Sequence, residues 1–495
     1  MILMPKREDI QKILLIGPGP IVIGQSGEFD YALHQACRVL KHEGFKTVLI
    51  NSDPITLATD ITETDTVYIQ PLTLESLLQV IELEKPDALL SVFGGQIAVN
   101  LAYLLAQSGR LDQFPIKFLG SDGHIFEKTE DRLRFRELIT GLGLNLPSGA
   151  IATGIDEGMA IGQQIGFPAV IRASLALEGA GVMVAYNMEE LEEFIEIGFN
   201  ASPIHQVLIE KSLSGWRELE FEVIRDSYDQ CLIVSSVESI DPLGVHIGDS
   251  AVTIPAYDLA PLNYVDLTEI CKKIIKKLGV VGGMNLQLAM NPASGEVVII
   301  EVNPRFTKSG ALVAKATGFQ IPAVTSKLAV GYDLNEVLAD SHWQSQPTWD
   351  YCAVKLPCFS FEKFPEADQV LGTTMKSVGE VMALGCDFKE AFQKAIRSMM
   401  NNRYGLGADG RDMDESKLSL VQIKEKLINP NVERWFYLRY ALKSGMSAQE
   451  VANLSKLSNW FIKEIQELVA LEKELTTYAL YNLTPAILLQ AKKWG

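Results

Sequence analysis

An acid and an amide stand at the end of a predicted strand, in the run VVIIEVNPRF over residues 297–306. Side chains alternate between the two faces of a strand, so Glu301 and Asn303 share one face while Ile300 and Val302 share the other. A buried carboxylate is costly unless a cation or hydrogen bonds compensate it. The chemistry to expect here is therefore cation binding.

The preceding strand supplies partners for these groups if Met290 pairs with Val298 across the turn of a hairpin. Oxygen-bearing side chains without sulfur or imidazole suit a hard cation such as Mg²⁺ or Mn²⁺, with phosphate oxygens in the remaining positions. The other interpretation is the solvent-facing side of an ordinary hairpin. Arg305 favours the first interpretation, because a fork of donors just past a carboxylate can hold an oxyanion beside a metal. The opposite pairs in this register are Gln287 with Glu301 and Asn285 with Asn303.

A glycine-containing turn is predicted in VIRASLALEGAGVMVAY, between a strand that ends at Arg172 and a second strand. Gly179 and Gly181 would let backbone amides approach phosphates closely, with Arg172 at the mouth of the turn. Taken alone, the same glycines are also ordinary turn formers.

A third segment, LIEKSLSGWRELEFEV, has an apolar strand that runs into Glu210, Lys211, Ser212 and Leu213. Its backbone groups could contact a purine edge, and Glu218 could reach ribose hydroxyls. The competing interpretation is the wet face of an amphipathic strand.

The N-terminal run GPGPIVIGQSGEFD resembles a dinucleotide-binding turn only in part. After Gly17 and Gly19 the third fingerprint position is Val22, and no acid follows at the expected distance, where Cys37 and Val39 stand. We therefore expect a Rossmann-like sheet without a dinucleotide.

The elements that position these groups fall into three predicted domains, of mixed α/β and α+β class. Residues 1–128 alternate short aliphatic strands with amphipathic helices, which indicates a parallel, helix-covered sheet. Residues 129–402 carry hairpins typical of an antiparallel α+β domain and begin with a charged helix, for which Thr129 is a candidate N-cap. Residues 403–495 have apolar residues at helical spacing and predict an all-helical domain.

Composition limits the possible partners. The 495 residues are 47% hydrophobic and carry a formal charge of −18, which opposes binding to nucleic acid or to an anionic membrane. No signal or membrane-spanning run is found, so we expect a soluble, cytoplasmic protein. The six cysteines lack paired spacing and predict reduced thiols.

Taken together, the chain resembles the N-terminal half of the large subunit of carbamoyl phosphate synthetase, in the ATP-grasp superfamily. The resemblance rests on ordered motifs along nearly the whole chain: MPKREDI, GPIVIGQSGEFDY, FGGQIAVN, EDRLRF, GFPAVIRAS, DPLGVHIGDS, EVNPR, KATGF, MKSVGEVMALG and NWFIKEIQELVALE. It implies a Rossmann-like pre-ATP-grasp domain, an ATP-grasp domain and a helical oligomerisation-type domain.

The resemblance also implies a function. The family's N-terminal half phosphorylates bicarbonate with ATP, and the carboxyphosphate reacts with ammonia to give carbamate for arginine and pyrimidine biosynthesis. A glutaminase small subunit would supply ammonia, and a C-terminal synthetase half, here a separate chain, would use the carbamate. A homo-oligomer is a further expectation. The chain ends at LLQAKKWG, inside the expected helical domain, so it is either one piece of a split enzyme, a fragment or a diverged copy.

Site residues follow from the motif match. Two Mg²⁺ or Mn²⁺ ions would be held by Gln287, Glu301 and Asn303, and the catalytic groups would be Arg305, His246 and Lys308. ATP would contact Arg132, Arg172, Gly179, Lys211, Leu213, Glu218, Gly244, Val245, His246, Gln287 and Glu301.

Some positions depart from the family's usual pattern. Glu178 stands where a glycine is usual and would repel a nearby phosphate, and Lys308 replaces arginine and loses its bidentate geometry. Ala173 replaces proline, and Lys211 replaces glutamate. Glu178 and Lys308 support an alternative, a catalytically impaired ATP-binding or assembly subunit of the same complex. Another ATP-grasp carboxylate ligase is a third possibility.

Overall fold

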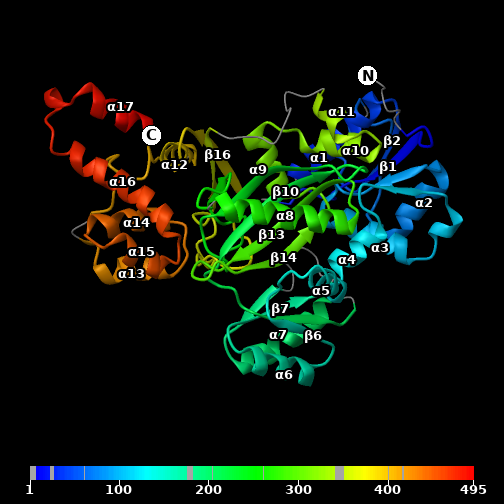
Figure 1. Cartoon of the computed structure of the whole chain (residues 1–495), viewed down its shortest axis with the longest axis horizontal. Coiled ribbons are helices and arrows are strands. Elements are labelled where there is room, and N and C mark those ends of the chain that lie inside the picture. Colours follow the sequence, from blue (N-terminus) through cyan, green and yellow to red (C-terminus); the bar gives the residue numbers. More distant parts are fainter. Residues whose placement is uncertain are drawn as a thin grey trace.

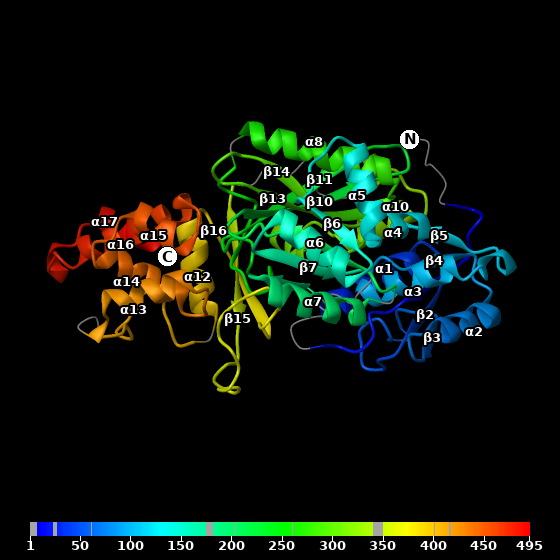
Figure 2. The same cartoon turned by 90° about the horizontal axis from the view of Figure 1, so that it is seen from below.

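The computed structural model describes residues 7–22, 27–60, 62–174, 182–202, 204–259, 261–339, 350–399, 401–414 and 417–495. Figures 1 and 2 show three sheets in the middle and N-terminal regions of the molecule and a group of helices at the C-terminal end. The sheets contain five, seven and four strands and are called here the N-terminal, large and small sheets. The C-terminal group is called the helical part.

The N-terminal sheet is entirely parallel, with the strand order β3-β2-β1-β4-β5. Its three central strands, β2, β1 and β4, are largely buried aliphatic runs, as expected for a sheet with helices on its faces, so the predicted fold of this region is confirmed. The elements are β1 (Lys12–Ile16), α1 (Gly27–His42), β2 (Lys46–Asn51), β3 (Thr66–Ile69), α2 (Leu74–Glu84), β4 (Ala88–Leu90), α3 (Gly95–Gln107) and β5 (Lys117–Leu119).

The small sheet projects to one side of the large sheet in Figure 1, together with two helices. Its strand order is β6-β9-β7-β8, and all neighbouring strands are antiparallel. Helices α6 and α7 bury its apolar face in a separate core. The elements are β6 (Gly149–Ala152), α6 (Ile155–Ile165), β7 (Ala169–Ala173), β8 (Val182–Ala185), α7 (Met188–Ala201) and β9 (Val207–Lys211).

The large sheet is antiparallel, with the order β14-β13-β10-β11-β12-β15-β16. Helix α8 (Pro261–Leu278) packs on one face, and α9 (Lys308–Thr317) and α10 (Ile321–Ala329) lie on the other side, followed by α11 (Leu334–Ala339). The strands are β10 (Arg217–Arg225), β11 (Cys231–Ser239), β12 (Val252–Ile254), β13 (Gly282–Met290), β14 (Val297–Asn303), β15 (Cys352–Cys358) and β16 (Gly379–Gly385).

The hairpin of β13 and β14 contains a β-bulge. Met290 pairs with Val297, so the expected pairing of Met290 with Val298 was wrong. The register then shifts by one residue, leaving Ile300 without an opposite residue, and Ile299 takes its place in the apolar core. Beyond the bulge the predicted pairs, Gln287 with Glu301 and Asn285 with Asn303, are confirmed.

The helix connecting the N-terminal sheet to the small sheet is divided in two, α4 (Gly123–Glu130) and α5 (Arg132–Gly141). The predicted N-cap Thr129 was wrong, because Thr129 lies inside α4 and its hydroxyl donates to Ile125 O at 3.1 Å. Asp131 caps α5 instead, since its carboxylate accepts from two exposed backbone amides of the first turn.

The helical part packs around an aromatic-rich core, and no strand follows Gly385 within the described ranges. Its helices are α12 (Phe388–Ser398), α13 (Leu420–Ile428), α14 (Arg434–Lys443), α15 (Ala448–Ser455), α16 (Asn459–Leu475) and α17 (Pro485–Lys493). Across the described chain, no helix combines the length and apolarity needed to cross a membrane. All six cysteines lie among the described residues, and none of them forms a disulfide.

Candidate functional site

Two rows of polar side chains cross three neighbouring strands of the large sheet. Alternation along β10, β13 and β14 directs their apolar residues toward α8, so the acids and amides must share the opposite face. Neighbouring strands are paired in register, which brings the polar side chains of each row within contact distance. The rows are Glu220, Gln287 and Glu301, followed by Glu222, Asn285 and Asn303.

Amide groups bridge the acids of these rows. The Asn285 side-chain nitrogen donates to Glu220 Oε2 at 2.8 Å and to Glu222 Oε1 at 2.7 Å. Gln287 Nε2 donates to Glu220 Oε1 at 3.1 Å. The Asn285 Oδ1 atom is buried and accepts no hydrogen bond from any described residue. An acceptor left open among carboxylates fits a site that a cation would complete.

Burial raises the pKa of the three acids that β10 contributes to this face. The pKa of Glu218 is raised to about 8 by burial and by the neighbouring charge of Glu220. The pKa of Glu222 is also raised to about 8, mainly by burial, and that of Glu220 is raised for the same reason. A divalent cation would reverse this effect, because it stabilises the ionised carboxylates that burial disfavours.

Glu301 is the half-buried acid of the first row and makes no side-chain hydrogen bond or ion pair with any residue in the described ranges. Within those ranges, no group of three or more His, Cys, Asp or Glu side chains has an arrangement that could hold a metal. The donor set proposed from sequence is different, with one carboxylate beside the amides of Gln287 and Asn303. Such a set suits Mg²⁺ only if oxygens of a bound phosphate complete the coordination.

Arg305 follows β14 and is held by the N-terminal sheet region. Its guanidinium is 2% exposed and donates to Gln96 Oε1 at 3.0 Å and to Phe306 O at 3.2 Å. Gln96 Nε2 in turn donates to Glu130 Oε2 at 2.9 Å. Burial raises the pKa of Glu130, and the nearby charge of Arg305 opposes the shift.

The end of β14 is also fixed through its backbone. Phe306 N donates to Val92 O at 2.9 Å, and the Ser121 hydroxyl donates to Pro304 O at 2.7 Å. The rings of Phe93 and Phe306 pack with their centroids 6.5 Å apart. The polar end of the large sheet is therefore built on the N-terminal sheet, a relationship that the sequence does not reveal.

Two arginines, one on α5 and one on β7 of the small sheet, lie next to the buried carboxylate of Glu210. Arg136 NH1 lies 3.1 Å from Glu210 Oε1, and Arg172 Nε lies 3.5 Å from Glu210 Oε2. Burial raises the pKa of Glu210, and the charges of Arg172, Arg136 and Arg132 oppose the shift. Arg172 has the same opposing effect on Glu218, so the small sheet presents positive charge toward the acid face of the large sheet.

The connection from β9 to β10 carries two other predicted contacts, Lys211 and Leu213. The Lys211 side chain is exposed, and its backbone N–H already donates to Ser148 O at 2.7 Å. The Ser212 N–H is likewise engaged, with Pro168 O at 3.0 Å. Recognition by backbone groups would therefore use Leu213 and the carbonyls of this segment.

Gly244, Val245 and His246 lie in the loop between β11 and β12. The loop pairs with the β9–β10 connection through the hydrogen bonds of Leu243 with Gly215 and Trp216. Gly244 has φ of 115°, a conformation that favours glycine. The loop thus places Leu243 and Gly244 beside residues 214–216.

The imidazole of His246 has a defined tautomer. The backbone N–H of Gly248 donates to His246 Nδ1 at 3.0 Å, so Nδ1 is an acceptor and the ring proton lies on Nε2. The backbone N–H of His246 donates to Gly372 O at 2.7 Å.

Lys308 begins α9, and its ammonium lies 3.3 Å from Glu380 Oε2. The same carboxylate oxygen lies 3.9 Å from the buried Lys355 ammonium. Lys355 Nζ donates to the carbonyls of Ile247, Gly248 and Ser250, at 2.8 to 3.0 Å. Burial lowers the pKa of Lys355 to about 8, and Glu380 opposes the shift.

Of the residues predicted from sequence, the structure brings Glu218, Gln287, Glu301 and Asn303 to one face of the large sheet, and the sequence reasoning missed several of their neighbours. Gly179 and the unusual Glu178 lie outside the described residues. Glu220 and Glu222 follow Glu218 at strand spacing, so alternation alone would have found them. The other residues missed are Gln96, Glu130, Glu210, Lys355 and Glu380.

Family models match three consecutive regions of the chain. The first is the carbamoyl phosphate synthase preATP-grasp domain, over residues 9–128. The second is the ATP binding domain of the carbamoyl-phosphate synthase L chain, over residues 131–337. The third is the oligomerisation domain of the carbamoyl-phosphate synthetase large chain, over residues 380–495.

Relatives match over almost the whole chain. The carbamoyl phosphate synthase large chain of Archaeoglobus fulgidus is 48% identical over 501 residues, covering 99% of this chain and 46% of the relative. The carbamoyl phosphate synthase large chain, N-terminal section, of Aquifex aeolicus is 45% identical over 497 residues, covering 99% and 88%. This chain spans about half the length of the Archaeoglobus relative.

Solved structures share the fold at low sequence identity. The Campylobacter jejuni biotin carboxylase, in a β-γ-ATP complex, matches with a TM-score of 0.58 at 15% identity, covering 90% of this chain and 99% of that chain. The biotin carboxylase domain of the Hydrogenobacter thermophilus 2-oxoglutarate carboxylase, in complex with MgADP, ADP and bicarbonate, has a TM-score of 0.56 at 20% identity, covering 73% and 77%.

Proposed function

Because the chain belongs to the family of carbamoyl phosphate synthase large chains, we propose that it phosphorylates bicarbonate with ATP and converts the carboxyphosphate to carbamate with ammonia. A bicarbonate oxygen attacks the γ-phosphorus, the bond to the β,γ-bridging oxygen breaks, and ADP leaves. The nitrogen of ammonia then attacks the carboxyl carbon, and phosphate leaves. The observation that carries the proposal is the double row of acids and amides that ends at the buried Arg305.

ATP would lie between the acid face of the large sheet and the basic side of the small sheet. Arg132 and Arg172 on the small-sheet side would contact its phosphates. The adenosine would be contacted by Lys211, Leu213, Glu218, and the loop residues Gly244, Val245 and His246. Gln287, Glu301 and Asn303 would hold one or two Mg²⁺ or Mn²⁺ ions, which neutralise phosphate charge when bound.

Arg305 would bind bicarbonate and then carboxyphosphate. Its guanidinium is fixed by Gln96, so the donors are oriented before the substrate arrives. Lys308 and His246 would stabilise charge on the phosphate side. Exclusion of water at this buried end of β14 would protect carboxyphosphate from hydrolysis.

The remaining partners follow from the same family. A glutaminase subunit would supply ammonia, and a separate C-terminal synthetase half would phosphorylate the carbamate. The helical part would mediate association between copies. The product would enter arginine and pyrimidine biosynthesis in the cytoplasm, where the six free thiols would stay reduced.

A second candidate is an ATP-binding subunit with impaired turnover. One observation favours it: Lys308, which stands where the family usually has arginine, is ion-paired with Glu380. An ammonium committed to a carboxylate stabilises a transferring phosphoryl group less than a free fork of donors does.

One measurement separates the two candidates. The purified chain is assayed for steady-state ADP release with Mg²⁺ and ATP, with and without bicarbonate, alone and with a glutaminase subunit. Bicarbonate-stimulated ADP release supports the first candidate. ATP binding by calorimetry with no bicarbonate-dependent ADP release supports the second, and absence of ATP binding contradicts both.

A further inference from the structure

A buried ion pair connects the helical part to the loop that carries His246. Arg434, in the first turn of α14, is 1% exposed and pairs with Asp241, which is 3% exposed. The other carboxylate oxygen of Asp241 accepts from the Ser250 hydroxyl and from Ala251 N, each at 3.2 Å. Asp241 thereby closes the two ends of the 241–251 segment and joins them to α14.

A second contact runs parallel to the ion pair. Leu371 N donates to Pro430 O, in the turn between α13 and α14, at 2.9 Å. The next residue, Gly372, accepts the backbone N–H of His246 at 2.7 Å. The helical part is therefore two hydrogen bonds away from the backbone of a proposed nucleotide-contacting residue.

The loop depends on such contacts because it has no regular secondary structure over residues 242–250. A cavity of about 780 Å³ adjoins it and is lined by Asp241 and Arg434 together with residues of both parts. Without Arg434, the Asp241 carboxylate would be buried and unpaired, and the loop would move so that water could reach it.

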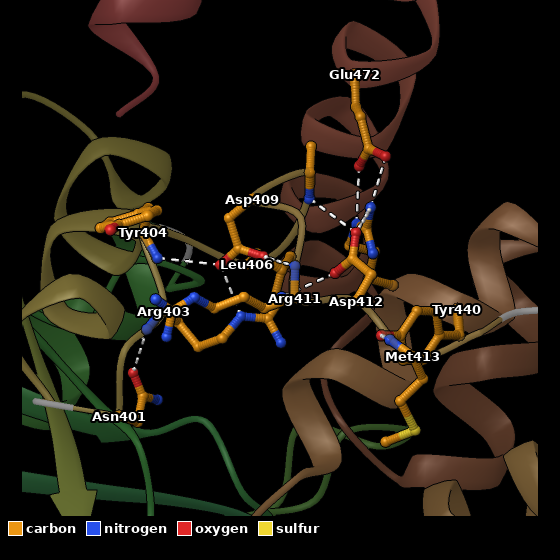
Figure 3. Close-up of polar contacts among 12 residues, drawn as sticks. Asn401, Arg403, Tyr404, Leu406, Asp409, Arg411, Asp412, Met413, Tyr440 and Glu472 are labelled. Atoms are coloured by element: carbon orange, nitrogen blue, oxygen red, sulfur yellow. Dashed lines mark hydrogen bonds and ion pairs between the residues drawn. The ribbon is translucent and has the colours of Figure 1, made fainter.

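Arg439 provides a natural comparison on the same helix. Its side chain is buried as well, but it pairs with Glu472 of α16 and with Asp412, two residues that are labelled in Figure 3. Both partners lie within the helical part, on α16 and between α12 and α13. Replacing Arg439 would loosen the helical part without touching the 241–251 segment.

We propose that Arg434 is a positioning residue of the nucleotide site, and that its ion pair with Asp241 transmits the state of the helical part to ATP affinity. The inference rests on the proposed function, because residues 244–246 are taken as nucleotide contacts. It goes beyond the proposed function, because the contact between the helical part and the 241–251 segment lies outside the nucleotide site and would still determine ATP affinity.

The test compares Arg434→Met with Arg439→Met in the full chain. The dissociation constant for ATP with Mg²⁺ is measured by calorimetry, and hydrogen exchange of residues 242–250 is measured without nucleotide. We expect Arg434→Met to weaken ATP binding by about 3- to 30-fold and to accelerate exchange in the loop. Arg439→Met should lower the unfolding temperature while leaving both quantities within about twofold of wild type.

Equal loop exchange in the two variants, or unchanged ATP affinity in Arg434→Met, would overturn the inference. If Arg434→Met does not fold, Arg434→Lys and Asp241→Asn are measured with the same two readouts and decide in its place. The exchange readout needs no activity. A wild-type chain that binds no ATP would contradict the proposed function, while the exchange comparison would still decide whether Arg434 holds the loop.

Discussion

Gln287 lies directly opposite Glu301, in the pair just beyond the β-bulge of the β13–β14 hairpin. The same row continues onto the neighbouring strand β10 with Glu220, whose Oε1 accepts a hydrogen bond from Gln287 Nε2 at 3.1 Å. The bulge restores the register at the end of the hairpin where the polar groups stand. The arrangement of the proposed cation ligands therefore depends on one extra residue, Ile300.

Glu301→Gln should abolish most of the bicarbonate-dependent ADP release. The substitution keeps size and hydrogen-bonding ability but removes the charge that would face the metal, so we expect a loss of about 100-fold or more. Glu296→Gln is the matched control, because Glu296 is an exposed acid on the same hairpin. An equal loss in both variants, or activity retained in Glu301→Gln, would contradict the proposed site.

The raised pKa of Glu218 predicts a pH-dependent stability. The folded-state pKa is about 8, above the ordinary value of 4.5. The protonated carboxyl therefore contributes to the free energy of unfolding fully below about pH 4.5, and this contribution is lost as the pH rises through about 8. Thermal unfolding from pH 5 to 9 without Mg²⁺ should show this decline. Glu218→Gln should reduce the slope of the free energy of unfolding against pH by about 1.4 kcal/mol per pH unit.

Binding of the metal should have the opposite dependence on pH. Ionised carboxylates are the form that a cation stabilises, so Mg²⁺ with ATP should bind more tightly at pH 8.5 than at pH 6.5 and should release protons. Calorimetry in two buffers of different ionisation enthalpy measures the released protons. No proton release would mean that these acids stay protonated in the complex.

Lys308→Met should lower the turnover number about tenfold or more while changing the Michaelis constant for ATP little, because the ammonium would act on transferring charge. Lys308→Arg should retain or raise turnover, since guanidinium offers two aligned donors. Lys315→Met, an exposed position on the same helix, is the control. Inactive wild type together with an active Lys308→Arg would favour the impaired-subunit alternative.

Gly94→Ala should destabilise the N-terminal sheet region. An added Cβ would lie 2.3 Å from Ile16 O and 2.6 Å from the Cβ of Ala98, and a backbone carbonyl cannot move aside cheaply. We expect a loss of about 1–3 kcal/mol. Gly141→Ala, where nothing lies within 4 Å, is the control. Calorimetric unfolding temperatures of the two variants make the comparison.

Alternation predicted much of the site, because strand geometry alone decides which side chains share a face. It placed Gln287 opposite Glu301 correctly even though the pairing used to derive it, Met290 with Val298, was wrong. The wrong pairing near the turn and the unrecognised bulge each shift the register by one residue, in opposite directions, so the two errors cancelled. The bulge was missed because the hydrophobic periodicity does not mark it. The family resemblance, confirmed by the relatives and family models, supplied the list of candidate residues.

Contacts between regions distant in sequence were beyond prediction. Gln96 holds Arg305 across 209 positions, and nothing in FGGQIAVN distinguishes that amide from a surface residue. Glu130 is similarly hidden, because its burial depends on packing against the large sheet. The N-cap of α5 was missed for a local reason: Thr129 and Asp131 are both good caps, and the break between α4 and α5 decides in favour of Asp131.

Because Lys355 is enclosed, chemical modification of its amine would report when β15 separates from the loop that Lys355 binds. Its side chain is 1% exposed, and burial lowers its pKa to about 8, so a reagent in solution does not reach the amine while the sheet is closed. An acylating reagent would modify it rapidly once β15 separates from the loop that it binds, and hardly at all before. Mass spectrometry of the proteolytic peptide that contains Lys355 would then measure transient local opening of the large sheet without any engineered label.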